Sequence, residues 1–286
     1  MATTLISKHP TGPAKTATGF PHVISITSGK GGVGKTNVSA NLAYLLASMG
    51  KRVVLLDADL GLANVDVILG LTPQKNIFHL FHENAKLDDI LFPTPYGFHI
   101  LPATSGVSDM LELDTGQKLE LLESMDTLEN RIDYLLVDTG AGINDNVLYF
   151  NLAVQERILV LTPEPTSLTD AYALIKVLKA QHGVERFRVV VNMAKSMAAA
   201  KEVYLKLHMA CDQFLSGISL DLLGVLPHDP NVRASVIRQQ PFTSVYPESP
   251  ASMALAGVAR RINAWKAPTQ LDGNIKFFWK KLLFQD

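Results

Sequence analysis

The sequence predicts a single α/β domain, with a doubly wound, mostly parallel sheet of seven or eight strands and helices on both of its faces. Short runs rich in apolar residues recur along the chain, and segments with helical spacing lie between them. The first run is followed by a glycine-rich loop and then by an amphipathic segment, which is the order strand, loop, helix. With 286 residues the chain can bury the core that such a domain needs.

Seven apolar runs are the predicted strands, and several of them are rich in Val and Ile. Runs of this kind are typical of strands that are buried on both faces of a parallel sheet. They span residues 22–27, 52–58, 97–103, 133–138, 157–162, 187–193 and 222–227.

Two of the intervening segments have clear helical spacing. In residues 35–50 the apolar side chains fall on one stripe, and Gly50 supplies the stop. In residues 166–183 either Thr166 or Ser167 can cap the start, and Gly183 ends the helix. Strands that alternate with helices predict right-handed crossovers between parallel neighbours.

Composition divides the chain into four parts. Residues 1–21 are rich in Thr, Ala, Lys, Gly and Pro without periodicity, which predicts a flexible leader. Residues 22–265 contain the α/β pattern. Residues 266–274 have the composition of a linker, and residues 275–286 form a separate tail.

Charge and cysteine content argue against several classes of protein. The formal net charge of −1 gives no general reason to expect direct nucleic-acid binding. No stretch is long and apolar enough for a signal peptide or a membrane span, so we expect a cytoplasmic protein. Cys211 is the only cysteine, and no carboxylate at ligand spacing accompanies His79 and His82, which argues against a disulfide and against a zinc site.

The glycine-rich loop is the most informative motif. Residues 29–36, GKGGVGKT, fit the pattern G-x-x-x-x-G-K-[ST] between a predicted strand and a predicted helix. Its glycines allow successive backbone N–H groups to point at phosphate oxygens. Lys35 can then neutralise the terminal phosphates, and the hydroxyl of Thr36 can bind Mg²⁺. The loop therefore predicts a site for a magnesium nucleotide.

Three carboxylates follow predicted strands of the same sheet. Asp138 ends a buried apolar run, where an unpaired carboxylate would be costly, so we expect it beside the metal, with a helix cap as the alternative. Asp57 and Asp59 end the second run. We expect Asp57 to support the metal shell and Asp59 to orient the attacking water, although Asp59 could instead cap a helix. Glycines at 140 and 142 would let the loop after Asp138 change conformation with the γ-phosphate.

The extra lysine of the loop, Lys30, gives it the deviant Walker A pattern, and the chain thereby resembles the SIMIBI class of P-loop ATPases, which includes the MinD and ParA types. Within that class it is most similar to the flagellar-number regulators of the FlhG family, which are also called FleN or YlxH-like. The similar segments, which lie within about residues 22–265, are 57–66, 138–143, 162–176, 189–194 and 232–252.

The resemblance implies a slow, regulatory ATPase that converts ATP to ADP and phosphate with Mg²⁺ and dimerises when ATP binds. Lys30 would reach across the dimer interface to the nucleotide of the other subunit, while Asp59 and Asp138 would lie in switches I and II. Asn192 would read the adenine edge, although an amide at a strand end could equally hold a turn. The implied nucleotide-binding residues are Gly29, Lys30, Gly31, Gly32, Val33, Gly34, Lys35, Thr36, Asn37, Glu164, Asn192, Leu226, Pro227, His228 and Asp229.

Two departures from the MinD pattern favour the FlhG branch. Thr139 and Gly140 stand where MinD commonly has a proline, and Asn37 replaces a second threonine. The N-terminal D-Q-A-x-x-L-R element, with which many FlhG proteins stimulate the GTPase FlhF, is absent from residues 1–21. The implied partners are a second copy of the chain and FlhF, flagellar switch proteins or a flagellar transcription regulator.

The tail has the pattern of an interfacial helix. Large apolar residues follow the spacing i, i+3, i+4, i+7, i+8 and lysines flank them, which predicts reversible binding to anionic lipids at the cytoplasmic membrane. Phe277 and Phe284 fall outside this face. The alternative is that the tail docks into a groove of its own domain. The residues predicted to bind the membrane are Ile275, Phe278, Trp279, Leu282 and Leu283, with Lys276, Lys280 and Lys281.

Three other functions remain open. A division-site regulator of the MinD type shares the fold and the tail. A DNA-partitioning ATPase of the ParA type would need a basic surface, which the net charge does not favour. A kinase or amidoligase on the same scaffold would normally add acceptor-binding insertions, and no large insertion is evident.

Overall fold

The computed structural model describes residues 20–59, 64–77, 79, 85–102, 115–266 and 275–284. The predictions for residues 1–19, for residues 267–274 and for His82 therefore lie outside the described residues.

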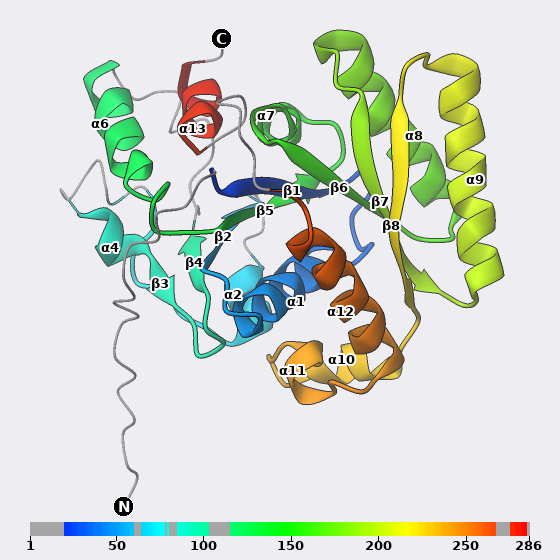
Figure 1. The fold of residues 1–286 in the computed structure, drawn as a ribbon, viewed down its shortest axis with the longest axis horizontal. Coiled ribbons are helices and arrows are strands. Elements are labelled where there is room, and N and C mark those ends of the chain that lie inside the picture. The colour runs from blue at the N-terminus through cyan, green and yellow to red at the C-terminus, as the bar shows by residue number, and fades with distance from the viewer. Residues whose placement is uncertain are drawn as a thin grey trace, which may run out of the picture.

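One sheet of eight strands runs through the described part of the chain, in the order β3-β4-β2-β5-β1-β6-β7-β8 (Figure 1). All neighbouring strands are parallel except β3 and β4, which pair antiparallel at one edge. The predicted fold class is confirmed, but β3 was missed because two residues show no periodicity. The strands are β1 His22–Ser28, β2 Val53–Ala58, β3 Phe92–Pro93, β4 His99–Pro102, β5 Tyr134–Ala141, β6 Glu156–Leu161, β7 Arg186–Ala194 and β8 Ser219–Pro227.

Helices cover both faces of the sheet (Figure 1). The first layer contains α1 Lys35–Ser48, α2 Val65–Leu69, α10 Pro230–Ile237, α11 Phe242–Val245 and α12 Pro250–Asn263. The second contains α4 Leu87–Ile90, α6 Thr115–Asp126, α7 Asp145–Ala153, α8 Pro165–His182, α9 Met197–Phe214 and α13 Ile275–Phe284.

The strands are apolar along their length because successive side chains enter opposite helix layers. In β1, Val23 packs in the second layer and Ile24 in the first, and both are fully buried. A strand covered on both faces has no position for an exposed polar side chain over this length, which explains the continuous apolar runs.

The ends of the two predicted helices differ in how well the sequence located them. Gly50 and Gly183 follow α1 and α8 with φ angles of 79° and 68°, which confirms both stop signals. The predicted cap of α8 at Thr166 or Ser167 is wrong. Pro165 occupies the first turn, where its missing N–H costs nothing, and Glu164 is the N-cap residue. The hydroxyl of Ser167 instead accepts the N–H of Thr162 at 3.0 Å.

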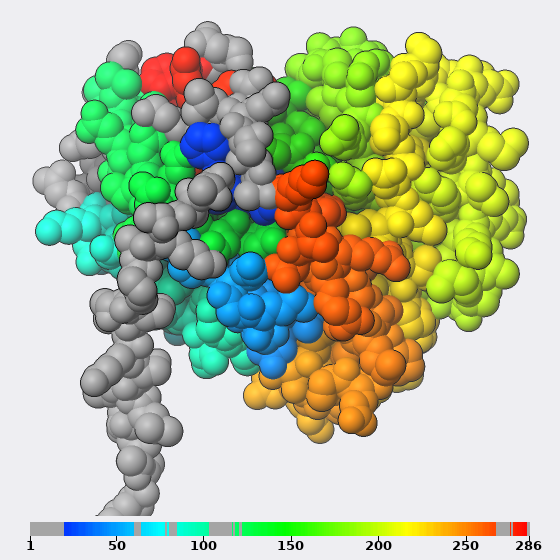
Figure 2. All heavy atoms as spheres, viewed as in Figure 1, coloured from blue at the N-terminus to red at the C-terminus, as the bar shows by residue number. Residues whose placement is uncertain are grey.

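The tail helix α13 docks on its own domain, against α6 and α7. The five apolar residues of its predicted membrane-binding set are each at most 1% exposed and belong to the core on that side of the sheet. The side chain of Lys276 lies outside the described part of the structure. Lys280 remains exposed, and the ammonium of Lys281 lies 4.6 Å from the centre of the Phe277 ring. Figure 2 shows atoms of α13 in red beside the green atoms of α6. The structure therefore realises the docked alternative.

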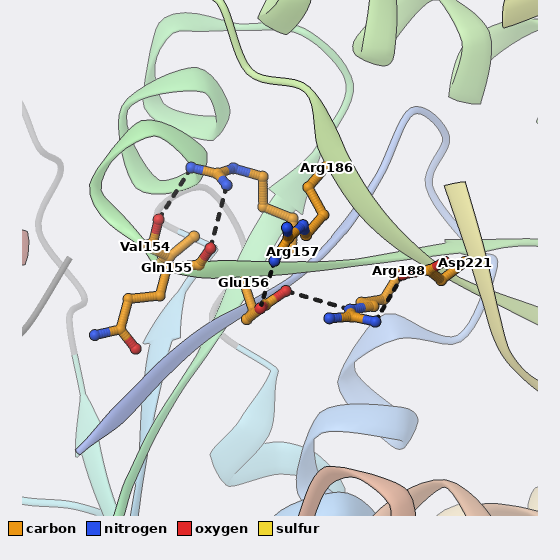
Figure 3. A network of polar contacts seen from close by, with 7 residues as sticks. All are labelled: Val154, Gln155, Glu156, Arg157, Arg186, Arg188 and Asp221. Carbon is orange, nitrogen blue, oxygen red and sulfur yellow. Dashed lines mark hydrogen bonds and ion pairs between the residues drawn. The ribbon is translucent and has the colours of Figure 1, made fainter. Parts of the chain in front are cut away.

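A polar network connects the amino ends of β6, β7 and β8 with the C-terminal end of α7 (Figure 3). The guanidinium of Arg157 donates to the carbonyl oxygens of Asn151, Val154 and Gln155 at 2.6, 3.0 and 3.4 Å, and so caps the C-terminal end of α7. Burial lowers the pKa of Arg157 to about 10.

Arg188 is the second centre of this network. It pairs with Glu156 at 3.3 Å and with Asp221 at 2.7 Å. Its guanidinium also lies 5.0 Å from the centre of the Trp265 ring, next to the end of α12. Arg188 therefore connects β6, β7 and β8 with Trp265, which follows the end of α12.

No helix within the described ranges is both long and apolar enough to cross a lipid bilayer.

Candidate functional site

The glycine-rich loop connects β1 to α1 at the carboxyl edge of the sheet. Gly32 and Gly34 have φ angles of 78° and 90°, which side chains disfavour. At Gly29 the constraint is space, because a Cβ would lie 2.1 Å from the carbonyl oxygen of Asp170 in α8. The loop therefore needs these glycines for its conformation and for its packing against α8.

Lys35 and Asp138 are both buried, and their charges influence each other. Lys35 is 7% exposed and Asp138 is 1% exposed. Burial lowers the pKa of Lys35, although Asp138 and Asp59 oppose the shift. Burial likewise raises the pKa of Asp138 to about 6, while hydrogen bonds from Ser39 and Thr36 partly offset this; Ser39 Oγ donates to Asp138 Oδ1 at 2.7 Å.

Asp57 lies beside Asp138, because the two are register partners in β2 and β5. Its Oδ2 accepts the N–H groups of Asn64 and Val65 at 3.2 and 3.1 Å, and so shapes the chain after residue 63. Burial and the nearby Asp138 raise the pKa of Asp57 to about 7. Two carboxylates side by side at low exposure form a site that favours bound positive charge.

These residues fit a magnesium ion by their chemistry. The hydroxyl of Thr36 and the carboxylates of Asp57 and Asp138 are hard oxygen donors, the kind that Mg²⁺ prefers in proteins. Both carboxylates have raised pKa values, so a divalent cation would remove an unfavourable burial of charge. No group of three or more His, Cys, Asp or Glu that could hold a metal occurs among the described residues.

The two predicted switch loops are in contact. A Cβ at Gly140 would lie 3.4 Å from Asp59 Oδ1, which places Asp59 close to the backbone of this glycine. The N–H of Gly142, a residue with a φ angle of 97°, donates to the carbonyl oxygen of Ser28 at 3.0 Å. The loop after β5 thus joins the residue predicted to orient water to the start of the phosphate loop.

The side chain of Lys30 contacts residues of its own chain. Its ammonium lies 3.1 Å from Glu164 Oε2 and donates to Thr166 Oγ1 at 2.8 Å. The structure therefore brings the predicted residues Lys30 and Glu164 together, and adds Thr166.

Asn192 lies at a β-bulge near the end of β7, where the register with β8 shifts between Val191 and Ala194. Its amide donates to the carbonyl oxygen of Val33 at 2.8 Å, so the predicted base-reading side chain contacts the phosphate loop. Met193 follows with a φ angle of 55°, which is unusual outside glycine. Bulges of this type re-aim side chains near active sites.

The residues of the loop predicted to close over the base, 226–229, differ in their burial and in their hydrogen bonds. Leu226 is buried, and the N–H of His228 donates to the carbonyl oxygen of Ala194 at 3.0 Å. Asp229 caps α10 by accepting the N–H of Asn231 at 2.9 Å, and it also accepts the N–H of Ala251 at 3.1 Å. Its carboxylate is therefore engaged with the backbone.

Sequence reasoning missed three polar residues of this region. Ser39 follows Lys35 by one helical turn, and this spacing could have predicted that both side chains lie on the same side of α1. Asn151 of α7 accepts from Ser25 Oγ at 2.9 Å and donates to Thr27 Oγ1 at 3.0 Å, and Thr166 contacts Lys30. These last contacts join residues more than 120 positions apart, and no local pattern announces them.

A family model described as the CobQ/CobB/MinD/ParA nucleotide binding domain matches residues 24–242. The chain belongs to this family. It is accordingly an ATPase of the MinD/ParA type that uses ATP and Mg²⁺.

Three similar proteins narrow the comparison. The chain is 46% identical to the antiactivator FleN of Pseudomonas aeruginosa, over 91% of this chain and 93% of that one. It is 33% identical to the flagellum site-determining protein YlxH of Helicobacter pylori, over 91% and 89%. The septum site-determining protein MinD of Pyrococcus horikoshii, solved with Mg-ADP, superimposes with a TM-score of 0.66 at 28% identity, over 85% of this chain and 96% of that one.

Proposed function

We propose that this ATPase is a dimerising switch that regulates the number or placement of flagella and associates reversibly with the cytoplasmic membrane through α13. ATP would favour the dimer and the membrane, and hydrolysis to ADP and phosphate would reverse both. The observation that supports this most directly is the position of α7, because this one helix contacts both the nucleotide edge and the tail.

Helix α7 begins directly after the loop that follows Asp138. Phe150 stacks on Phe278 of the tail, with ring centroids 6.3 Å apart and an interplanar angle of 24°. The next residue, Asn151, bonds to Ser25 and Thr27 of β1, just before the phosphate loop. Helix α7 therefore connects the loop after Asp138 with the tail, while Asn151 anchors it to β1. A displacement of that loop would change how α7 packs against the tail.

In the proposed reaction, Lys35 and the loop N–H groups bind the phosphates, and Asp59 orients the attacking water. Thr36, Asp57 and Asp138 would hold Mg²⁺, which supplies charge neutralisation at the β- and γ-phosphates. Lys30 of one subunit would complete the site of the other. Asn192, together with Leu226, Pro227 and His228, would border the base.

The energetics of the docked tail favour reversible docking. Each large apolar side chain contributes roughly 1.5–3 kcal/mol when fully buried, whereas ordering the chain costs about 1–2 kcal/mol per residue. The buried indole N–H of Trp279 has no hydrogen-bond partner among the residues that the structure describes. Such a group costs about 1–3 kcal/mol, and a membrane interface, where Trp N–H groups find partners, would relieve it.

Dimerisation would convert weak tails into a firm attachment. One tail binds lipid weakly for the same energetic reasons, but two tails on one dimer gain about 10²- to 10⁴-fold in avidity. The bound nucleotide would therefore determine whether the protein lies at the membrane or away from it. Its protein partners would be FlhF, flagellar switch proteins or a flagellar transcription regulator, which the similarity to FleN and YlxH supports.

Sedimentation with anionic liposomes tests the membrane step. We expect pelleting with ATP, little with ADP, and little for Lys30→Ala with either nucleotide. Lys280→Glu leaves the docked helix intact, because Lys280 is exposed there, and should reduce pelleting severalfold at about 1 kcal/mol per lysine. Lys201→Glu, at an exposed lysine of α9, is the matched control. Equal pelleting with ATP and ADP would remove the proposal.

A deletion strain distinguishes the biological roles. We expect altered flagellar number or position with normal division. Minicells with normal flagella would instead favour a division-site role, which the similarity to MinD keeps open, and plasmid loss would favour a DNA-partitioning role.

A further inference from the structure

Lys30 occupies a defined place on its own subunit, formed by the start of α8. Glu164 is the N-cap residue of this helix and Thr166 lies in its first turn, and the ammonium of Lys30 contacts both. We propose that Glu164 and Thr166 form a rest site that holds Lys30 in cis and thereby opposes dimerisation. This inference rests on the proposed role of Lys30 across the dimer interface.

The rest site follows from the packing of the phosphate loop on α8. Gly29 directly precedes Lys30, and its α-carbon is so close to α8 that a Cβ would lie 2.1 Å from the carbonyl oxygen of Asp170. The backbone of Lys30 therefore starts at a fixed position relative to the first turn of the helix. A lysine side chain extending from that position meets Glu164 and Thr166 on its own subunit.

The electrostatics of the helix end make both contacts necessary. The N-terminus of an α-helix has a partial positive charge, which repels an ammonium group. Lys30 lies there because the carboxylate of Glu164 reverses the local sign and the hydroxyl of Thr166 offers a lone pair. Removing the charge of Glu164 would make the start of α8 repulsive to the lysine.

The rest site binds Lys30 weakly enough for a bound triphosphate to compete for the lysine. The side chains of Lys30 and Glu164 are 37% and 59% exposed, and exposed ion pairs of this kind are weak. A triphosphate in a site that excludes water attracts the lysine more strongly. Loss of one exposed pair shifts an equilibrium by about threefold, and a dimer withdraws two lysines, so the dimer dissociation constant should change by about tenfold.

The dimer dissociation constant, measured by light scattering over a range of protein concentrations with a non-hydrolysable ATP analogue, tests the rest site. We expect Glu164→Gln to tighten the dimer about tenfold, and Thr166→Val to tighten it a few fold. Thr166→Ser keeps the hydroxyl and should retain the wild-type constant. Glu202→Gln removes a similarly exposed pair, with Lys206 on α9, and should also leave the constant unchanged.

The outcomes separate the rest site from the switch itself. In a Lys30→Ala background, Glu164→Gln should have no effect, because the rest site acts only through the lysine. A weaker or unchanged dimer for Glu164→Gln would overturn the rest site while leaving the switch in place, provided that Lys30→Ala weakens the dimer. If the wild type stays monomeric with the analogue, both the switch and the rest site are wrong.

Discussion

The nucleotide edge of the sheet and the tail helix α13 both contain side chains that are nearly inaccessible to water, but the two regions bury opposite kinds of side chain. At the nucleotide edge Lys35, Asp57 and Asp138 are all less than 8% exposed. At the tail the buried side chains are apolar, and within the described ranges the indole N–H of Trp279 is buried there without a hydrogen-bond partner. Burial is costly in the first region and favourable in the second.

Because of this difference, the two regions should respond to different changes in their surroundings. The carboxylates at the nucleotide edge have raised pKa values, so a bound cation would relieve them. The tail packs its apolar side chains on α6 and α7, so a competing apolar surface or a change in α7 would displace it. The nucleotide edge, which would respond to a bound cation, and the tail, which would respond to a competing apolar surface, are thus both in contact with α7.

The largest effect is expected at Lys35. Lys35→Ala removes the buried cation beside Asp138 and leaves a negative site that repels phosphate, so ATP affinity should fall at least a hundredfold, or about 3 kcal/mol. Titration calorimetry measures it. Lys201→Ala, at an exposed lysine of α9, should retain full affinity. A loss below tenfold at Lys35 would contradict the view that this edge depends on its buried charge.

A pH effect should follow from Asp57 in the protein without nucleotide or Mg²⁺. Its folded pKa of about 7 lies above the ordinary 3.8, so the fold favours the protonated acid and the free energy of unfolding should fall as pH rises from about 4 to 7. Asp57→Asn, which cannot ionise, should remove the contribution of Asp57 to that slope, with Asp138 supplying the remainder, and should stabilise the protein at pH 8 by on the order of 1–3 kcal/mol. Urea unfolding at several pH values measures this. A steeper slope in the variant would show that burial of Asp57 is not the cause.

The tail should lose less stability on truncation of an aromatic side chain than the central core does. Phe278 and Phe98 are both at most 1% exposed. Phe98→Ala should cost about 3–5 kcal/mol, the usual cost in a core. Phe278→Ala should cost only about 1–2 kcal/mol, because the tail undocks once its marginal free energy of docking is lost. Denaturant unfolding gives the two values, and proteolysis should cleave the tail faster in the second variant. Equal costs would mean that α13 is a permanent core helix.

The smallest effect is expected at Arg188. Arg188→Gln removes ion pairs with Glu156 and Asp221 and the contact with Trp265, and should cost about 1 kcal/mol without changing ATP affinity. Arg186→Gln is the matched control, because its pair with Glu156 spans 3.9 Å and its side chain is 63% exposed, and it should cost less than about 0.5 kcal/mol. Thermal unfolding measures both. Similar values for the two arginines would show that the Trp265 contact adds nothing.

Local sequence was sufficient wherever a feature depends on neighbours along the chain. The strands followed from continuous apolar runs, since both faces of the sheet are covered. The helix ends at Gly50 and Gly183 followed from the positive φ angles that glycine accepts. The start of α8 was misplaced because a favourable proline at position 165 outweighed the hydroxyls at 166 and 167.

The proximity of some predicted site residues was predictable for the same reason, while their roles stay predictions. GKGGVGKT and the carboxylates at the ends of β2 and β5 meet because parallel strands bring their carboxyl ends to one edge, so Lys35, Asp57 and Asp138 were predictable together. The place of Lys30 was not predictable, because Glu164 and Thr166 lie 134 and 136 residues away.

The sequence by itself determined the parallel sheet, the phosphate loop and the amphipathic pattern of residues 275–284, because each is a periodicity or a motif within a few residues. It did not determine what covers that amphipathic face, because an apolar stripe fits a membrane and a protein groove equally well. Only the tertiary structure decided this, by placing α6 and α7 where Phe278 and Trp279 are withdrawn from water. Burial is a property of the surroundings, and the surroundings of α13 come from segments more than 100 residues earlier.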